Sequence, residues 1–515
     1  MTIHAVFLGI LVLCLFAGIL SGVPAMLAIA GVPLVVAVVA SLFGAFDLSF
    51  LAFYPSRVWG VMTNGLLMAV PLFVLMGVVL ERSRLAENML NVLRDMLGSS
   101  ARGLALSVLL FSAMIAASTG IIGATVVMLG LVSLPAMLNA GISPRLSSGL
   151  ICASGTLGQI IPPSIILVLL GDQIGNAYLE AQQKAGNFAP DPVSVGDLFA
   201  GALLPGLMLV GLYGLYVLLA LRRGKAGPAA PVERVAVPAR RVLGTFLPPL
   251  LLIVAVLGSI LGGVATTTEA AGVGAAGAVL LAAWSCGGKS RLGQGLVLAA
   301  GLAALLLVIL RSTGQLPPVP GSATAIVATA AALLLGAGVA AAGFRLNRAG
   351  IFLPAIIDTL KISGMVFGIV VAASMLSLVF RGFGGEEIVG ALMDAVPGGE
   401  WGALVIVMIV IFLLGFILEA VEIIYIVVPL LGAPILASDF SPVWFAILIA
   451  MNLQTSFLTP PFGFALFYYR SVAPRSISTA EIYRAIIPFV AIQIVAIMLI
   501  VSFPDIATWL PGLLF

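Results

Sequence analysis

The chain has 515 residues, of which 62% are hydrophobic and only 8% are charged, and its net charge is +3. About 25% of the residues in an ordinary soluble domain are charged, so this composition excludes a soluble globular protein. The small net charge, with the basic residues in short loops, argues against a nucleic-acid partner. The cysteines, Cys14, Cys152 and Cys286, have no paired spacing, which argues against a disulfide framework and a thiolate metal site.

Apolar stretches long enough to cross a membrane recur along the whole chain. A bilayer core of about 30 Å needs roughly 20 apolar residues per helix. The stretches are continuous and do not alternate in polarity, which favours helices over a β-barrel. The first one lacks a basic n-region and a convincing cleavage site, so we expect it to be retained as a span. In chain order, the predicted spans are 4–20, 23–46, 62–81, 101–117, 198–221, 244–263, 264–286, 294–310, 323–343, 361–381, 401–418 and 480–503.

Two amphipathic stretches, 85–97 and 386–396, each follow a predicted span. The first carries apolar residues on one face, with Glu87, Arg94 and Asp95 elsewhere, and the second is comparable. Each stretch is typical either of a helix lying in the membrane interface or of an ordinary amphipathic connector.

The charges of two loops predict which side of the membrane each loop faces. The loop after residue 221 has six basic residues and one acidic residue, Glu233, so it is predicted to be cytoplasmic. The loop from 173 to 197 has more acidic than basic residues and lies one span away, so it is predicted to face the opposite side. The six basic residues are Arg222, Arg223, Lys225, Arg234, Arg240 and Arg241.

An internal repeat links the two halves of the chain. Residues 71–172 match residues 368–470 in the order of their elements and in the positions of their helix breaks, at an offset of about 298 residues. The pairs of consecutive prolines at 162–163 and 460–461 anchor the match, and earlier breaks at Ser118 and Glu419 support it. The sequence therefore predicts two related repeats.

Consecutive prolines predict broken helices. They remove two backbone donors and disfavour helical geometry in the preceding residue, so a helix tends to stop and restart there. The freed backbone groups are tolerated at bilayer depth only where they face a cavity or a ligand, and transporters use such half-helix ends to bind anionic groups and Na⁺. Each repeat is therefore predicted to form a broken-helix hairpin with a binding role.

Polar residues gather at these breaks. Their hydroxyl and amide oxygens, together with backbone carbonyls, are hard ligands that suit an alkali cation. The alternative is that they hold helices together, because Ser, Thr and Gly are common at membrane helix contacts. The residues are Ser118, Thr119, Gly120, Thr125, Ser154, Thr156 and Ser164 in the first repeat, and Asn452, Gln454, Thr455, Ser456 and Thr459 in the second.

Charged residues inside a membrane are costly and usually functional. Glu419 and Glu422 stand at the earlier break of the second repeat. Glu269 is typical either of a transport role or of an N-terminal helix charge at an interface. Arg470 closes the second hairpin, where it either attracts a carboxylate substrate or extends to the lipid headgroups.

At these residues the chain resembles the large membrane subunit of tripartite ATP-independent periplasmic (TRAP) transporters, over nearly its whole length. The resemblance implies an elevator-type, Na⁺-driven secondary transporter in the bacterial inner membrane, which is not an enzyme and has no cofactor besides the coupling ion. It also implies that an organic acid arrives from a periplasmic binding protein and that a small four-helix membrane subunit is a partner. The resembling strings are PLFVLMGVVLERS at 71–83, ATVVMLGLVSLPAM at 124–137, SGTLGQIIPPS at 154–164, DLFAGALLPGL at 197–207, TEAAGVGAAGA at 268–278 and TPPFGFALF at 459–467.

The resemblance extends to the binding site with two departures. The family's Ser-Gly-Ser-Ser motif, followed one residue later by Ala-Thr, aligns with residues 119–125 (TGIIGAT), where isoleucine replaces two serines. An Asp that the family usually has ten residues before the proline matching Pro429 is Glu419 here, which keeps the charge. The predicted ion-binding residues are Ser118, Thr119, Gly120, Gly155, Gly158, Pro162, Glu419, Thr455, Thr459 and Pro460. The predicted substrate-binding residues are Thr125, Ser164, Asn452, Gln454 and Arg470.

The predicted fold is an all-α polytopic membrane protein with an inserted pair of spans. The apolar block 294–343 lies where shorter family members have a brief link, and it either packs against the small subunit or has a scaffold role. Because the chain begins with spans like those of the large subunit, the small subunit is expected to be a separate chain. The predicted parts are N-terminal scaffold spans at 1–70, the first repeat at 71–172, a loop and scaffold spans at 173–263, connecting spans at 264–360, the second repeat at 361–470 and a C-terminal span at 471–515.

Two other functions compete with this interpretation. An intramembrane enzyme needs a nucleophile with a base, or a metal site, and the only histidine is His4. Composition does not exclude an enzyme with a catalytic pair of aspartates, but Asp172 and Asp358 lie near the ends of predicted spans. The GGKS at 287–290 lacks the earlier glycine of a phosphate loop, which is Ala283 here. The second rival is a two-hairpin carrier that works without a binding protein. No residue specifies which organic acid is carried.

Overall fold

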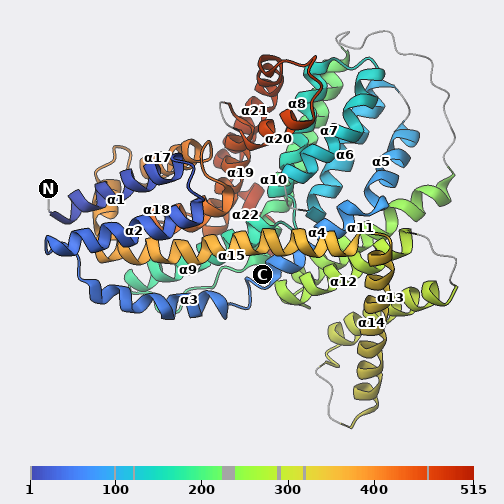
Figure 1. Ribbon diagram of the computed structural model, residues 1–515, viewed down its shortest axis with the longest axis horizontal. Coiled ribbons are helices and arrows are strands. Elements are labelled where there is room, and N and C mark those ends of the chain that lie inside the picture. The colour runs from blue at the N-terminus through green and yellow to red at the C-terminus, as the bar shows by residue number, and fades with distance from the viewer. Residues whose placement is uncertain are drawn as a thin grey trace.

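The computed structural model of the chain describes residues 3–97, 100–119, 122–222, 238–286, 291–316, 321–460 and 463–515. Every regular element in these ranges is helical, which confirms the predicted all-α fold class. Figure 1 shows α1 and α2 at one end, the long α15 running through the middle, and α13 and α14 projecting at the other end. The elements before the first repeat are α1 Ile3–Leu20, α2 Ala25–Leu42, the 3₁₀ helix η1 Leu48–Phe53 and α3 Tyr54–Met62.

The two repeats contain matching helices with a segment of five helices between them. The first repeat comprises α4 Ala69–Arg82, α5 Arg84–Leu97, α6 Ala101–Thr119, α7 Ile122–Asn139, α8 Pro144–Gly155, the 3₁₀ helix η2 Thr156–Gln159 and α9 Ile165–Lys184. The intervening helices are α10 Val195–Arg222, α11 Ala239–Leu261, α12 Thr267–Ser285, α13 Arg291–Ser312 and α14 Ala323–Arg348. The second repeat comprises α15 Phe352–Gly382, α16 Gly385–Asp394, α17 Gly399–Leu414, α18 Ala420–Leu436, α19 Pro442–Leu458 and α20 Phe464–Val472, and α21 Thr479–Ser502 and α22 Asp505–Leu514 follow it.

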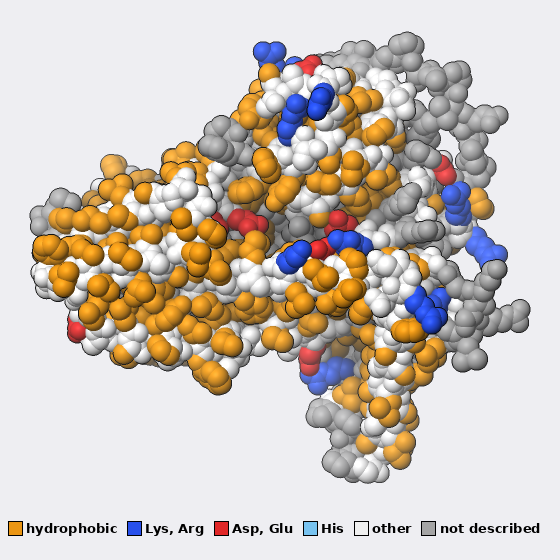
Figure 2. All heavy atoms as spheres, in the orientation of Figure 1, with side chains coloured by type: hydrophobic (Ala, Val, Ile, Leu, Met, Phe, Trp, Pro, Cys, Tyr) orange, Lys and Arg blue, Asp and Glu red, His pale blue; other side chains and the backbone are white. Residues whose placement is uncertain are grey.

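Within the described ranges, ten helices are long and apolar enough to cross a membrane. Apolar side chains also cover most of the face in Figure 2, and large ones such as Leu13, Leu42 and Leu333 are at least 70% exposed. Since water disfavours such a surface, lipid is its natural surrounding. The ten helices are α1, α2, α7, α10, α11, α12, α13, α14, α15 and α21.

Two predicted spans differ from their helices by more than five residues at one end. The span predicted at 62–81 begins later, at α4, because Asn64 interrupts the helix and its side-chain oxygen accepts a hydrogen bond from the Leu66 amide at 3.0 Å. The span predicted at 361–381 begins earlier, at Phe352, because Asp358 and Lys361 lower the local hydropathy without ending the helix. Both predicted amphipathic stretches are helices, α5 and α16.

The helices of the two repeats keep one constant spacing. α6, α7 and α8 begin at residues 101, 122 and 144, and α17, α18 and α19 begin 298 residues later in each case, at 399, 420 and 442. The local chemistry repeats as well, because Ser143 and Ser441 cap α8 and α19 and each is followed by a proline. Serine at the N-cap and proline at the first helical position are both favoured helix starts. The predicted internal repeat is therefore confirmed.

The repeats cover each other reciprocally. α18 of the second repeat packs along α9 of the first, and α7 of the first packs against α20 of the second. At the centre, residues 146–155 of α8 and 443–458 of α19 are all buried. The helices that lead into the breaks are thus the best shielded parts of the molecule.

The inserted block forms two helices, α13 and α14, that pack against each other and against α12. Their close approach depends on Gly338, where an added Cβ would collide with the side chain of Ala300 and lie 3.2 Å from the Leu296 carbonyl oxygen. Both helices are long and apolar enough to cross a membrane, and Figure 1 shows them standing apart from the rest of the bundle.

We predict that Gly149→Ala destabilises the fold by about 1–3 kcal/mol. Gly149 of α8 faces α21, where an added Cβ would collide with the Ala485 carbonyl and lie 2.7 Å from the Phe489 ring. The measurement is thermal unfolding in detergent. Gly244→Ala in α11 is the matched control, because its Cβ would have no neighbour within 4 Å. Equal midpoints for the two variants would contradict the packing argument.

Candidate functional site

The earlier break of each repeat separates two antiparallel helices. In the first repeat, α6 ends at Thr119 and α7 begins at Ile122. In the second, α17 ends at Leu414 and α18 begins at Ala420, with Glu419 as the residue before it. Ser118 and Thr119 are the last residues of α6, although their side chains, and the whole of Gly120, lie outside the described part of the chain.

The later break of the first repeat follows Gly155, the last residue of α8. The chain then forms η2, which includes Gly158, passes through the cis Pro162-Pro163 bond and restarts as α9. The Ser164 hydroxyl donates to the Gln159 carbonyl at 2.9 Å, which satisfies one of the acceptors freed by the break. Ser164 and Pro162 are both buried.

The later break of the second repeat begins where α19 ends at Leu458. The Thr459 hydroxyl donates to the Thr455 carbonyl at 2.7 Å, and the Thr455 hydroxyl donates to the Met451 carbonyl at 2.8 Å. A hydroxyl that donates in this way keeps its oxygen lone pairs available. Pro460 follows, whereas Pro461 lies outside the described residues.

Gln454 and Thr156 join the two later breaks. The Gln454 side-chain Nε2 donates to the Thr156 hydroxyl oxygen at 3.3 Å, and both residues are fully buried. They are 298 residues apart, which is the offset of the repeat, so they occupy equivalent positions. Two equivalent positions can touch only where the repeats meet at their approximate symmetry axis. The two breaks therefore meet at the centre of the molecule.

A cavity of about 310 Å³, here called the hairpin cavity, lies between the breaks. Both repeats contribute to it, and an added Cβ on Gly123 would lie 2.8 Å from the Tyr468 ring, so the first hairpin closes directly on the second repeat. The lining residues are Ile122 and Gly123 from the first hairpin, Glu419, Ala420 and Val421 from the second, Gln159, Ile165, Ile166, Phe457, Phe464 and Tyr468 around the later breaks, and Ile362, Met365 and Val366 from α15.

The two hairpins differ in charge at this cavity. The first turn of α7 has no acidic residue, so its N-terminal backbone amides present an uncompensated partial positive charge. The first turn of α18 has Glu422, whose carboxylate accepts a hydrogen bond from the Glu419 amide at 3.1 Å. Glu419 adds a second carboxylate at the cavity wall. The cavity therefore has one end that favours an anion and one that favours a cation.

Two buried oxygens near the breaks lack donors. The Oε1 atoms of Gln159 and Gln454 accept no hydrogen bond from any described residue, although the two side chains are at most 1% exposed. A buried acceptor without a donor is unfavourable unless something else coordinates it. Amide, hydroxyl and carbonyl oxygens are hard donors, and the chemistry of those near the breaks fits an alkali cation such as Na⁺.

The predicted substrate-binding residues do not all lie at the hairpin cavity. Thr125 lies buried in the first turn of α7, close behind the cavity wall. Gln454 reaches Thr156, as described above. Asn452 instead donates to the Met408 carbonyl of α17 at 2.6 Å, and Arg470 donates to the Ile477 carbonyl at 2.6 Å, and neither lines the hairpin cavity. The substrate roles of these residues stay predictions.

Several residues that line the hairpin cavity were not predicted from the sequence. Gln159 had a signal, since it is a polar residue three positions before Pro162 in an apolar segment. The aromatic and aliphatic lining residues, such as Phe457, Tyr468 and Met365, carry no such signal, because they resemble ordinary packing residues.

One face of α15 lines cavities along most of its length. Beyond the hairpin cavity, Asp358, Lys361 and Ile362 line a cavity of about 500 Å³ together with Glu81 and Arg82 of α4, and Arg82 forms an ion pair with Asp358. We call it the inner cavity. Ile362 belongs to both cavities, so they adjoin. Figure 2 shows a hollow between α15 and the helices above it, with acidic and basic side chains in it.

The opposite end of the same face lines a third cavity of about 320 Å³, here called the outer cavity. α15 contributes Val370, Ala373, Ser374, Ser377 and Arg381, and each of them lies three or four residues from another, so they share one helical face. The other walls come from α3, α9, α16 and α18, and include Asn64, Asp172 and Tyr425.

Loop charge identifies the two sides. Arg241, one of the basic residues that follow α10, lies in the first turn of α11 and forms an ion pair with Asp95 of α5 at 3.5 Å. The basic residues face the cytoplasm by the positive-inside rule, so α5 and the adjoining end of α4 lie on the cytoplasmic side. The inner cavity, lined by Glu81 and Arg82 at that end of α4, is therefore cytoplasmic, and the outer cavity lies toward the periplasm.

Comparisons with known proteins agree with this architecture. Residues 12–316 and 289–506 match the family model of the tripartite ATP-independent periplasmic transporter, DctM component. The C4-dicarboxylate TRAP transporter large permease protein of Vibrio cholerae is 26% identical over 450 residues, covering 87% of this chain and 86% of that protein. The ectoine TRAP transporter large permease protein of Halomonas elongata is 26% identical over 455 residues, covering 87% of each.

A third relative and one solved structure extend the comparison. The sialic acid TRAP transporter permease protein of Haemophilus influenzae is 24% identical over 459 residues, covering 87% of this chain and 60% of that protein. The crystal structure of the YdaH transporter of Alcanivorax borkumensis shares the fold, with a TM-score of 0.54 at 12% identity and coverage of 88% of both chains. The chain therefore belongs to the tripartite ATP-independent periplasmic transporter family as a large permease subunit for an organic solute, a multi-pass transporter component of the inner membrane and not an enzyme.

Proposed function

We propose that this subunit imports a small organic acid by a Na⁺-coupled elevator movement, that a periplasmic binding protein delivers the acid, and that a small four-helix membrane subunit works with it. The observation that carries the proposal is the single face of α15 that lines the inner, hairpin and outer cavities in turn. The names of the relatives include a C4-dicarboxylate and sialic acid as solutes, which supports an organic acid.

The charge asymmetry of the hairpin cavity supports a carboxylate substrate. Its anionic group would bind at the N-terminus of α7, where Ile122 and Gly123 line the cavity and no acidic residue competes. Glu419 and Glu422 make the corresponding end of α18 unfavourable for the same anion. The cavity volume of about 310 Å³ suits a small solute.

The donor set at the breaks supports Na⁺ as the coupling ion. Gln159 Oε1, Gln454 Oε1 and the hydroxyl oxygens of Thr455 and Thr459 are the groups that would hold it, with backbone carbonyls freed by the breaks. Bound Na⁺ would supply positive charge that makes anion binding more favourable. These protein groups bind the ion with hard oxygen atoms and exclude lipid, since residues 443–458 of α19 are buried.

The face of α15 supports an elevator movement. The starts of α7 and α18 line the hairpin cavity together with Met365, and this cavity adjoins the inner cavity but shares no lining residue with the outer cavity, which Ala373 lines. Eight residues of helix separate these positions, so moving the hairpin cavity from one to the other requires a displacement of about 12 Å along α15. In the proposed movement, this arrangement corresponds to the inward-facing state.

We predict that cysteine pairs report this displacement. In a chain with Cys14, Cys152 and Cys286 replaced by serine, Val421→Cys with Met365→Cys should be joined by a short bifunctional thiol reagent, because both residues line the hairpin cavity. Val421→Cys with Ala373→Cys should react only when the hairpins have moved outward. Gel mobility measures both. Absence of the second product in a preparation that transports would exclude the elevator movement.

We predict that uptake requires Na⁺ and both partners. In proteoliposomes containing this chain and its small subunit, a loaded binding protein and an inward Na⁺ gradient should raise the initial rate of organic-acid uptake by roughly tenfold over an equal K⁺ gradient. Uptake of free solute without the binding protein would instead indicate a carrier that works alone. Equal rates in Na⁺ and K⁺ would remove the coupling proposal.

We predict that Gln454→Leu weakens Na⁺ activation. It removes an unpartnered buried oxygen and the bond to Thr156, so the Na⁺ concentration for half-maximal uptake should rise roughly tenfold, equivalent to about 1.4 kcal/mol. Thr508→Val in α22 is the control, because it removes a different polar group, a hydroxyl that donates to the Pro504 carbonyl, in a helix that does not line the hairpin cavity. An unchanged Na⁺ dependence in Gln454→Leu would contradict the assigned ion site.

A further inference from the structure

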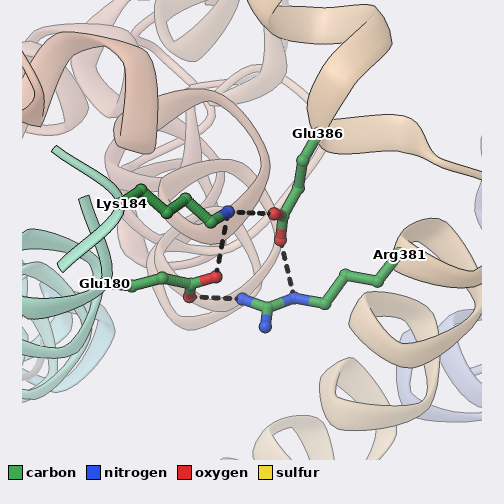
Figure 3. Close-up of polar contacts among 4 residues, drawn as sticks. All are labelled: Glu180, Lys184, Arg381 and Glu386. Atoms are coloured by element: carbon green, nitrogen blue, oxygen red, sulfur yellow. Dashed lines mark hydrogen bonds and ion pairs between the residues drawn. The ribbon is translucent and has the colours of Figure 1, made fainter. Parts of the chain in front are cut away.

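Four charged side chains form a closed ring where the periplasmic ends of α9 and α15 meet the start of α16 (Figure 3). Arg381 donates to Glu180 at 2.6 Å and pairs with Glu386 at 2.8 Å. Lys184 lies 3.3 Å from Glu180 and 2.5 Å from Glu386. Each carboxylate therefore contacts both cations, and the signs alternate around the ring.

The ring is partly shielded from water. The side chains of Glu386, Glu180 and Arg381 are 21%, 32% and 34% exposed, and only Lys184 is more than half exposed. An isolated surface ion pair contributes little to stability, whereas several charges with good geometry form a network that contributes more. Four contacts among four residues meet that condition.

The ring joins elements that belong to different parts of the transporter. Glu180 and Lys184 stand at the end of α9, which starts at the later break of the first repeat and packs along α18, so it belongs with the hairpins. Arg381 stands at the end of α15, the helix that lines all three cavities. The ring thus crosses the surface along which the hairpins would move.

Glu386 extends the ring to α16, the helix that connects α15 to the second hairpin. It lies in the first turn of α16, two residues after Gly384, whose φ of +68° is a left-handed conformation that favours glycine. The ion pair between Arg381 and Glu386 therefore connects the two sides of the turn between α15 and α16. A change in the direction of α16 at Gly384 would pull Glu386 away from its partners.

A second polar bridge lies in the same outer cavity. Asp172 of α9 accepts hydrogen bonds from Asn64 at 2.9 Å and from Tyr425 of α18 at 3.2 Å. Asn64 precedes α4, whereas Tyr425 belongs to the second hairpin, so Asp172 ties the moving part to the static part beside the ring. In the inward-facing state, the periplasmic end is held at two neighbouring points.

We propose that the ring of Glu180, Lys184, Arg381 and Glu386 is an ionic latch that holds the transporter in its inward-facing state and must open before the hairpins move toward the periplasm. The inference rests on the proposed elevator movement, because the latch acts by joining α9 to α15. Outward movement would carry α9 along α15 by more than the reach of these side chains. The latch sets the balance between the two states and, with it, the access of the delivered solute.

The test measures the two states directly. Spin labels at Leu48, an exposed residue near the end of α15, and at Phe188, an exposed residue after α9, are placed in the full-length cysteine-free chain in nanodiscs with its small subunit. Pulsed electron resonance should give two distance populations. Arg381→Gln removes two of the four contacts and should raise the ratio of the outward to the inward population roughly fivefold.

Two further variants test whether the effect of Arg381→Gln comes from opening the latch or only from the loss of one charge. Arg241→Gln removes the arginine of another ion pair on the cytoplasmic side, and it should leave the populations unchanged. The fourfold inversion Glu180→Lys, Lys184→Glu, Arg381→Glu and Glu386→Arg restores alternating signs, and it should return the ratio toward that of the wild type. Uptake with a loaded binding protein is measured in parallel.

The outcomes distinguish the two proposals. Two populations in the wild type with an unchanged ratio in Arg381→Gln would overturn the latch and leave the elevator movement intact. One population under every Na⁺ and substrate condition, in protein that transports, would overturn the elevator movement itself. An equal effect of Arg241→Gln, or no recovery by the inversion in protein that folds, would also count against the latch.

Discussion

The architecture depends on one requirement, that broken backbone inside a membrane be covered by protein. Hydrocarbon offers no hydrogen bonds, so every amide and carbonyl freed by a break needs a partner or a polar cavity. Here each repeat shields the breaks of the other, with α18 along α9 and α7 along α20. Local bonds such as that from Ser164 to the Gln159 carbonyl satisfy some of the freed groups, and the rest surround the hairpin cavity. Neither repeat would be stable alone, because its breaks would then face lipid.

Much of this could be predicted from sequence because it depends on local chemistry. Pro162 and Pro460 locate the later breaks, since proline disfavours a continuous helix, although the consecutive Pro248 and Pro249 lie inside the unbroken α11. The inserted helices and the connectors follow from continuous or periodic apolar patterns. The extent of α15 was underestimated because Asp358 and Lys361 resemble the end of a span, whereas they line the inner cavity. Polarity inside a long helix therefore marked a cavity and not a boundary.

The arrangement of the site depended on contacts between residues far apart in the chain. Asn452 and Gln454 are two residues apart and equally polar, yet one bonds to the Met408 carbonyl and the other to Thr156. Only the packing of α19 between α17 and η2 distinguishes them. The ionic ring had no sequence signal either, because Glu180 and Arg381 are 201 residues apart and each is an ordinary charge at a helix end.

The bond between Thr156 and Gln454 has a consequence for the ancestry of the fold. If a half-length ancestor assembled as a pair, the residue on its two-fold axis would have faced an identical copy of itself, and any substitution there would have appeared twice. Joining both halves in one chain removed that restriction, so one position could become a hydroxyl and its counterpart an amide. The same freedom applies to the hairpin tips, where Glu419 has Ile121 as its counterpart in the sequence. In such an ancestry, duplication followed by fusion would allow a symmetric centre to acquire one end that favours anions and another that favours cations.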